Sequence, residues 1–147
     1  AEIAPMINRM VDAGIPVSGH LGLTPQSVHK FGGYGLRAKD DAEAEKLISD
    51  AKALDEAGCF CIVLEKVPAA LAQKVTESVS CATIGIGAGN CCDGQVLVYA
   101  DMLGMNPSFR PKFVRKYADL YNVMTSAIAQ YVNDVKSTDF PNETESY

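Results

Sequence analysis

The chain has 147 residues, of which 48% are hydrophobic, and its formal net charge is −5. This length suits one domain or part of one, and the apolar content is typical of a globular protein. No cluster of lysine and arginine is dense enough to neutralise a nucleic-acid backbone, which argues against nucleic acid as a partner. No apolar stretch approaches the ~20 residues of a membrane-spanning helix, so the sequence predicts no membrane partner either.

Cysteine usage bears on the cellular compartment. The five cysteines are Cys59, Cys61, Cys81, Cys91 and Cys92. Their number is odd, none forms a C-x-x-C pair, and three lie in strand-like runs, so we interpret all five as packing residues. Reduced thiols and the lack of a signal-peptide pattern predict a reducing, cytoplasmic location.

The first part of the chain predicts a helix, a strand and a second, short helix. Residues 1–14 place apolar side chains at helical spacing and end on a glycine, which is typical of an amphipathic helix. Residues 15–23 (IPVSGHLGL) predict a short strand. Pro25 after Thr24 suits the first turn of a short helix, on which His29 would lie at the surface.

The central part carries stronger signals. An apolar stripe over residues 41–57 predicts a helix, with Asp40 and Glu43 as a capping box and Gly58 after its end. The run 59–65 (CFCIVLE) then predicts a buried strand.

The same alternation continues to the end. Residues 68–79 predict a helix, residues 81–87 (CATIGIG) a strand, and residues 95–101 (QVLVYAD) a fourth strand. The broad apolar face of residues 111–136 predicts a long C-terminal helix, and residues 137–147 form a polar tail.

Short strands that are apolar on both faces favour a parallel sheet covered by helices. Two α/β architectures then compete: a doubly wound open sheet, and a barrel whose functional residues lie at the carboxyl ends of its strands. His20, Glu65 and the loop 85–89 fall near the ends of three consecutive strands, which favours the barrel. Because such a barrel needs eight strands, residues 1–147 would form one partial domain, about half a barrel.

Glu65 is the first candidate for chemistry. It ends an apolar strand, and Pro68 begins the next helix soon after it. A carboxylate backed by Val63 and Leu64 at a barrel mouth is partly withdrawn from water, which strengthens it as a general base for a proton on carbon beside a carbonyl. The alternative is a structural ion pair with a lysine or arginine from a neighbouring loop, and the residues alone support both equally.

Other polar positions allow two interpretations each. His20 lies between glycines that would let a ligand approach, but a buried, hydrogen-bonded structural histidine is the alternative. IGIGAG (84–89) departs from the dinucleotide fingerprint because its third glycine comes one position early. It could present backbone N–H groups to a ligand, or pack closely at a barrel rim. Asp93 and Asp101 could be metal ligands, although caps are the favoured interpretation.

Several long motifs agree in order and spacing with one family. They are GHLGLTPQSVHKFGGY, AEAEKLISDAKALDEAGC, IVLEKVPAALA, TIGIGAGNCCDGQVLV, PKFVRKY and DFPNE. The chain resembles ketopantoate hydroxymethyltransferase (3-methyl-2-oxobutanoate hydroxymethyltransferase) over nearly all its length, from about Ala13. The resemblance implies the C-terminal half of a (β/α)8 TIM barrel of the phosphoenolpyruvate/pyruvate type, with about four strands.

The resemblance also implies an activity and a site. The family transfers a one-carbon unit from 5,10-methylenetetrahydrofolate to C3 of 3-methyl-2-oxobutanoate, giving 2-dehydropantoate for pantothenate and coenzyme A synthesis. Glu65 matches the general base of its LExVP motif, and His20 matches the substrate-binding histidine of GHxGLTP. Ile84, Ile86 and Gly87 would line the same pocket. A bound Mg²⁺ would stabilise the enolate that forms when the base removes the C3 proton.

One departure limits what can be carried over. The family's metal-binding aspartates and its K-x-E-G-G segment belong to the first half of the barrel and would lie upstream of Ala1. No metal ligand is therefore assigned in this chain, and we expect it to be a fragment that is inactive alone. Ala100 stands where the family often has histidine.

Two alternatives remain for the function. The first is a related metal-dependent lyase of 2-oxo acids, against which the GHLGLTPQSVHKFGG and IGIGAG motifs argue. The second is a non-catalytic assembly module. The family forms large homo-oligomers, decamers when intact, and helix 111–136 could pack either against a neighbouring subunit or against its own barrel.

Overall fold

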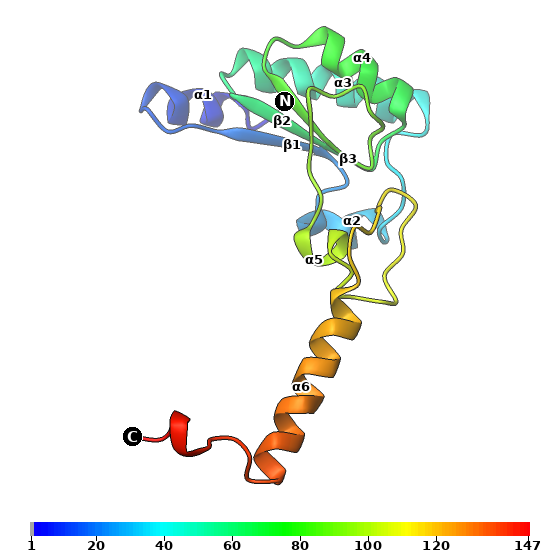
Figure 1. Cartoon of the computed structure of the whole chain (residues 1–147). Coiled ribbons are helices and arrows are strands. Elements are labelled where there is room, and N and C mark those ends of the chain that lie inside the picture. The colour runs from blue at the N-terminus through cyan, green and yellow to red at the C-terminus, as the bar shows by residue number, and fades with distance from the viewer. Residues whose placement is uncertain (1) are drawn as a thin grey trace. The chain divides into compact units, whose positions relative to one another are not determined.

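The computed structural model describes residues 2–147. It divides the chain into two compact units, Ala1–Val96 and Leu97–Tyr147, where the sequence predicts one partial domain. The first unit contains a sheet with its helices, and the second contains a long helix and the segments before and after it (Figure 1). Of the helices in the described part of the chain, none combines the length and apolar character needed to cross a membrane.

Four parallel strands form the sheet of the first unit and follow one another in chain order. They are β1 (Ser18–Gly22), β2 (Cys61–Glu65), β3 (Ala82–Ile86) and β4 (Gly94–Gln95). The register places His20 beside Val63 and Val63 beside Ile84. Within residues 2–147, the outer edge of β1 has no partner strand, so its backbone groups are unpaired there.

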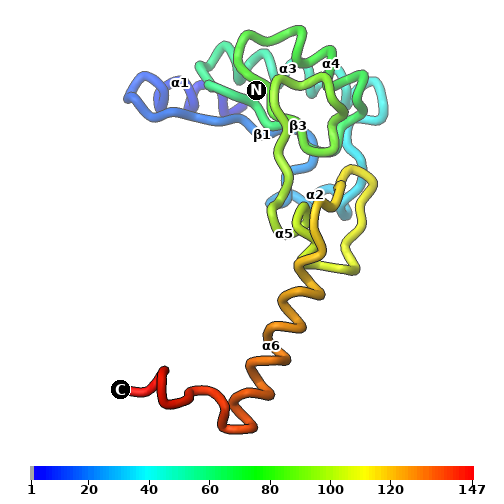
Figure 2. The backbone as a smooth tube through the Cα atoms, viewed as in Figure 1, coloured from blue at the N-terminus to red at the C-terminus, as the bar shows by residue number. Residues whose placement is uncertain are grey.

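Helices cover one face of this sheet. The helices that contact the strands are α3 (Asp41–Glu56) and α4 (Ala69–Ser78). The unit also contains α1 (Ala4–Asp12) and α2 (Val28–Phe31), and α2 contacts the 3-10 turn before it, η1 (Pro25–Ser27). Figures 1 and 2 show α3 and α4 side by side against the strands, and α1 contacts α3. A doubly wound sheet carries helices on both faces. Because the helices cover only one face, the fold is the half barrel that the sequence predicts and not a doubly wound sheet.

Alternation along the strands separates a covered face from an open one. Ile62, Leu64 and Thr83 are 0% exposed on the face that α3 and α4 cover. The core beneath the helices continues through Leu54 and Val75. The opposite face of the sheet is only half-buried, and its side chains include His20, Val63, Glu65, Ile84 and Ile86.

The start of α3 follows the sequence prediction in part. Asp40 caps the helix, because its Oδ1 accepts the Glu43 N–H at 2.9 Å. The second bond of a capping box does not form. The Glu43 carboxylate instead accepts the Ala38 N–H at 2.7 Å and pairs with Arg37. The predicted capping box is therefore correct in its first bond and wrong in its second.

The predicted fourth strand over residues 95–101 is wrong beyond Gln95. β4 ends there, and residues 99–102 form a short helix, α5 (Tyr99–Met102), in which the Met102 N–H donates to the Val98 carbonyl at 2.9 Å. β-Branched residues favour strands mainly through packing against neighbouring strands. Val96 and Val98 are 45% and 52% exposed, so they have little such packing.

The predicted helix over 111–136 starts too early. The structure has α6 (Leu120–Lys136), and Pro111 lies in an irregular segment before it. Two amides that a longer helix would need are used elsewhere. The Tyr117 N–H donates to the Met102 carbonyl at 2.8 Å, and the Leu120 N–H donates to the Leu103 carbonyl at 3.0 Å. The tail contains one 3-10 turn, η2 (Glu143–Glu145).

Candidate active site

Glu65 is the last residue of β2 because the backbone turns directly after it. Lys66 has a φ of 48°, in the left-handed region that ends a strand, and its N–H donates to the Ile86 carbonyl at 2.9 Å. The Glu65 carbonyl accepts the Leu23 N–H at 2.8 Å. The Lys66 ammonium donates to the Tyr34 carbonyl. Backbone bonds on both sides thus fix the carboxylate at the end of β2.

His20 contacts Glu65 across the open face of the sheet. Its Nε2 lies 3.1 Å from Glu65 Oε2. In the register, His20 is opposite Val63, and Glu65 is opposite Gly22, two residues further along each strand. The imidazole therefore reaches diagonally across the two strands to the carboxylate. The structure therefore brings together the two polar residues that the sequence selects, and it does so through a direct hydrogen bond.

The surroundings of this pair determine what it can do. The Glu65 side chain is 15% exposed and the His20 side chain 34%, so the carboxylate is the more withdrawn from water. An ionised carboxylate only accepts hydrogen bonds, so Nε2 of His20 carries the shared proton when Glu65 is charged. Within residues 2–147, no lysine or arginine forms an ion pair with Glu65. The alternative of a lysine or arginine partner therefore finds no support in the described residues.

Apolar side chains border the carboxylate on the side of β3. Ile86 lies opposite Glu65, and Ile84 lies opposite Val63, both on the open face. Gly87 follows with a φ of 65°, where the chain leaves the strand. Gly89 serves close packing, because a Cβ there would lie 2.5 Å from Ala69 Cβ at the start of α4. The glycine loop thus combines a half-buried apolar wall with a tight contact behind it.

Of the two remaining acidic candidates, Asp93 has a structural role, whereas Asp101 does not act as a cap. Asp93 Oδ2 accepts the Thr83 N–H at 2.7 Å and the Thr83 hydroxyl at 3.0 Å, and the backbone bond lowers the pKa of this carboxyl. Asp101 lies inside α5, whose cap position is Val98, so the cap interpretation is wrong for Asp101. Among residues 2–147, no group of three His, Cys, Asp or Glu side chains could hold a metal ion.

Arg37 is a neighbour of the site that the sequence analysis misses. It lines a cavity of about 250 Å³ together with His20 and Phe31. Its guanidinium lies 4.1 Å from the centroid of the Phe31 ring and pairs with Glu43, while its backbone N–H donates to the Lys66 carbonyl at 2.8 Å. The available signal was a single arginine in the otherwise apolar, glycine-rich loop GYGLRA.

Comparisons with known proteins agree with one another. The family model for ketopantoate hydroxymethyltransferase matches residues 1–143. A 3-methyl-2-oxobutanoate hydroxymethyltransferase from Bacteroides thetaiotaomicron is 64% identical over 146 residues, which are 99% of this chain and 54% of that protein. Proteins of the same name from Flavobacterium johnsoniae and Prosthecochloris aestuarii are 61% and 57% identical, with 99% of this chain covered and 54% and 52% of theirs. The chain spans about half the length of these relatives. It belongs to the ketopantoate hydroxymethyltransferase family.

Proposed function

We propose that this chain takes part in the transfer of a hydroxymethyl group from 5,10-methylenetetrahydrofolate to 3-methyl-2-oxobutanoate, giving 2-dehydropantoate. The names of its relatives supply the substrate and the transferred group. One observation carries the proposal: a carboxylate at the end of a parallel strand, Glu65, is hydrogen-bonded to His20 on the open face of a half barrel.

Glu65 acts as the general base. It accepts the proton of the C3–H bond, and the bonding electrons form the enolate of the keto acid. The enolate carbon then bonds to the methylene carbon that the folate carries, and the hydroxyl of a water molecule bonds to the same carbon. The two bonds from that carbon to N5 and N10 of the folate break, and tetrahydrofolate leaves with two protons on these nitrogens, one from C3 of the keto acid and one from the water. His20 engages Oε2 only, and within residues 2–147 no hydrogen bond occupies Oε1. The second oxygen is therefore available to the substrate proton.

The residues around the base suit a branched, apolar substrate. Ile84, Ile86 and Gly87 offer a wall against which the isopropyl group of the keto acid could lie. His20 orients the carboxylate towards that wall, and its remaining exposed edge could also meet the oxo or carboxylate group of the substrate.

The described residues do not fit a Mg²⁺ site. Such a site needs several oxygen ligands, and no group of three suitable side chains occurs in residues 2–147. The reaction still needs an electrophile at the oxygen where the enolate charge collects. We therefore propose that this function comes from residues outside the described ones, on strands that pair with the free edge of β1.

The test uses a chimaera that joins this chain to the part of the Bacteroides thetaiotaomicron relative outside the match. Glu65→Gln keeps the size of the side chain and removes its basicity. We expect exchange of the C3 hydrogen with deuterated water to slow by at least about a hundredfold. Nuclear magnetic resonance of the keto acid follows this exchange without any folate.

Glu77→Gln is the matched control. Glu77 is exposed on α4 and bonds only to Gln73 among the described residues, so the same chemical change there should leave the exchange rate unaltered. Equal exchange rates in Glu65→Gln and the parent chimaera would refute the role of Glu65.

A second candidate function is assembly, and the exposure of α6 favours it. From Tyr121 to Lys136 every residue except Asp134 is exposed, including Val123 at 63% and Ile128 at 59%. Apolar surface of this extent on one helix is typical of a face that packs against another chain. We propose that α6 packs against a second copy of the chain.

Removing residues 120–147 tests the assembly role. We expect the full 147-residue chain to have the mass of an oligomer by light scattering, and the truncated chain to have the mass of a smaller species. A monomeric full-length chain would contradict the proposal. Circular dichroism of the truncated chain checks that the first unit still folds.

A further inference from the structure

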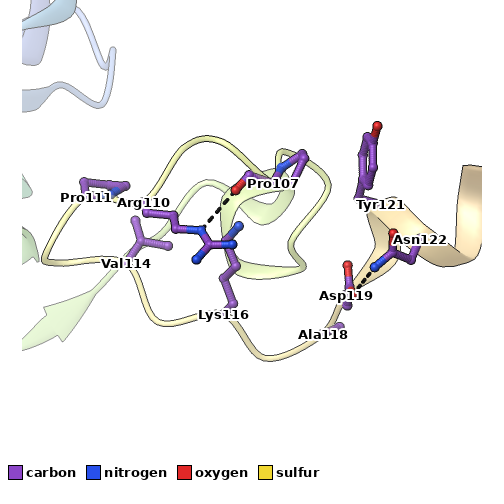
Figure 3. A pocket seen from close by; sticks show the side chains of 9 residues that line it. All are labelled: Pro107, Arg110, Pro111, Val114, Lys116, Ala118, Asp119, Tyr121 and Asn122. Carbon is purple, nitrogen blue, oxygen red and sulfur yellow. Dashed lines mark hydrogen bonds between the residues drawn. The ribbon is translucent and has the colours of Figure 1, made fainter.

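A cavity of about 590 Å³ lies in the second unit, between the irregular segment and the start of α6 (Figure 3). Its wall mixes apolar and cationic side chains: Pro107, Arg110, Pro111, Val114, Lys116 and Tyr121. This volume is within the range of small-molecule sites. All of its residues come from the second unit, so the cavity is distinct from the face that carries Glu65.

Positive charge is concentrated at this cavity. Four lysines and arginines occur within residues 110–116, in a chain of net charge −5. None of the four forms an ion pair with an acid in the described part of the chain. Of these four, Arg110 and Lys116 line the cavity, whereas Lys112 and Arg115 do not.

Hydrogen bonds hold the two cavity cations in place. Arg110 Nε donates to the Pro107 carbonyl at 3.1 Å, and Lys116 Nζ donates to the Asn106 carbonyl at 2.8 Å. In Figure 3 the Lys116 side chain points towards the Arg110 guanidinium. Two positive groups directed at one another without an acid between them repel, and an anion placed between them would remove that repulsion.

The one acid at the cavity is already engaged. Asp119 Oδ2 accepts the Asn122 Nδ2–H at 2.5 Å, at the end where α6 begins. It is therefore turned to Asn122 rather than to the two cations. The side of the cavity that Arg110 and Lys116 line keeps its positive charge.

The composition of the cavity wall restricts the chemical class of the ligand. Two cations require at least two negative charges, which the single carboxylate of 3-methyl-2-oxobutanoate does not supply. Two prolines, a valine and a tyrosine provide apolar surface that an inorganic anion would not use. The ligand should therefore join an apolar or aromatic body to two or more carboxylates.

We propose that this cavity binds the aminobenzoyl-glutamate end of the folate co-substrate, with its carboxylates on Arg110 and Lys116. This assignment rests on the proposed function, which names a folate, and it concerns binding rather than the proton transfer at Glu65. Charge-assisted bonds from both cations supply affinity, and the apolar wall receives the aromatic ring.

Binding of p-aminobenzoyl-glutamate to the 147-residue chain, measured by calorimetry, tests the proposal. We expect binding that weakens with added salt, that tightens for p-aminobenzoyl-triglutamate, and that is far weaker for p-aminobenzoate, which lacks the glutamate. The double variant Arg110→Gln/Lys116→Gln should bind p-aminobenzoyl-glutamate at least about tenfold more weakly, because two charge-assisted bonds are lost.

The matched control removes the same charge from the same segment. Lys112→Gln/Arg115→Gln should bind like the parent, since neither residue lines the cavity. Equal loss in the two double variants would overturn the proposal, because the net charge of the segment would then explain the binding. No binding by the parent, equal binding of p-aminobenzoate, or equal competition by inorganic phosphate would overturn it too.

The outcome is independent of the proposed function. Exchange of the C3 hydrogen needs no folate, so Arg110→Gln/Lys116→Gln in the chimaera should leave the exchange rate unchanged. A failure to bind p-aminobenzoyl-glutamate would remove this site and leave the role of Glu65 intact. Circular dichroism of both double variants confirms that α6 still forms.

Discussion

Gly22 fixes the distance between β1 and the backbone of Glu65. Its φ is +87°, and a Cβ at this position would lie 2.2 Å from the Glu65 carbonyl oxygen and 2.7 Å from Val67 Cγ1. Only glycine adopts this conformation without strain, and only glycine fits the space. The close approach brings His20 on β1 and Glu65 on β2 within hydrogen-bond distance.

Gly22→Ala should therefore disturb both stability and the site. We expect a loss of about 2 kcal/mol in the free energy of unfolding, from left-handed strain and the backbone contact. The C3 hydrogen exchange of the chimaera should also slow, since Glu65 must move. Gly35→Ala is the control, because nothing lies within 4 Å of a Cβ there. Similar losses by urea denaturation in the two variants would contradict this role for Gly22.

At the scale of elements, Asp55 joins the end of α3 to the start of β3. Its carboxylate accepts the Ser80 N–H at 2.8 Å and the Cys81 N–H at 2.9 Å. The hydrogen bond from the Ser80 backbone is the largest cause of the lowered pKa of Asp55. A lowered folded pKa means that the stabilisation is complete above the unfolded value, about 4, and is lost as the pH falls through the folded value.

Asp55→Asn should destabilise the chain by about 1 kcal/mol at pH 7, because a neutral amide accepts these bonds more weakly. The difference from the parent should shrink as the pH falls below about 4, because the unfolded parent chain then binds a proton at Asp55 before the folded chain does. Urea denaturation across pH 7 to pH 3 measures both effects. Glu56→Gln, at the exposed end of the same helix, should show neither. A difference that does not depend on pH would contradict the assignment.

Helices whose first residues follow a capping residue or a proline were predictable from the sequence. Helix α3 begins at the residue after Asp40, and α4 begins directly after Pro68, as the capping and proline signals predict. The predicted bounds are wrong where hydrogen bonds between residues distant in the sequence determine the end or the start of an element. The run 95–101 leaves the sheet after Gln95, and α6 begins at Leu120 because amides before it bond to the end of α5. Neither set of bonds has a signal in local periodicity.

The sequence predicts which residues belong to the candidate site, but it does not predict how they are arranged in space. Glu65 and His20 stand out because each is polar within an apolar or glycine-rich run. Their contact depends on the register of β1 against β2, which places His20 opposite Val63. Arg37 was missed because its place beside His20 depends on the path of a loop, for which the sequence has no periodic signal.

At the scale of the whole molecule, the open face of the sheet and the short length of the chain relative to its relatives have the same explanation. The helices bury Ile62, Leu64 and Thr83 on one face of the sheet, while the face with Glu65 is half-buried and the edge of β1 is unpaired within residues 2–147. A barrel interior has this property when some of its strands are absent. The chain spans about half the length of its curated relatives, which agrees with that interpretation.

The 147-residue chain alone should therefore show no turnover with Mg²⁺, 3-methyl-2-oxobutanoate and methylenetetrahydrofolate. The proposed base, Glu65, is present, but the described residues hold no group that could bind the metal, and water reaches the face where the enolate would form. Release of tetrahydrofolate, followed by absorbance, measures the reaction, and the chimaera serves as the active control. If the isolated chain turned over as fast as the chimaera, a half barrel would suffice for catalysis, and the need for further strands would be refuted.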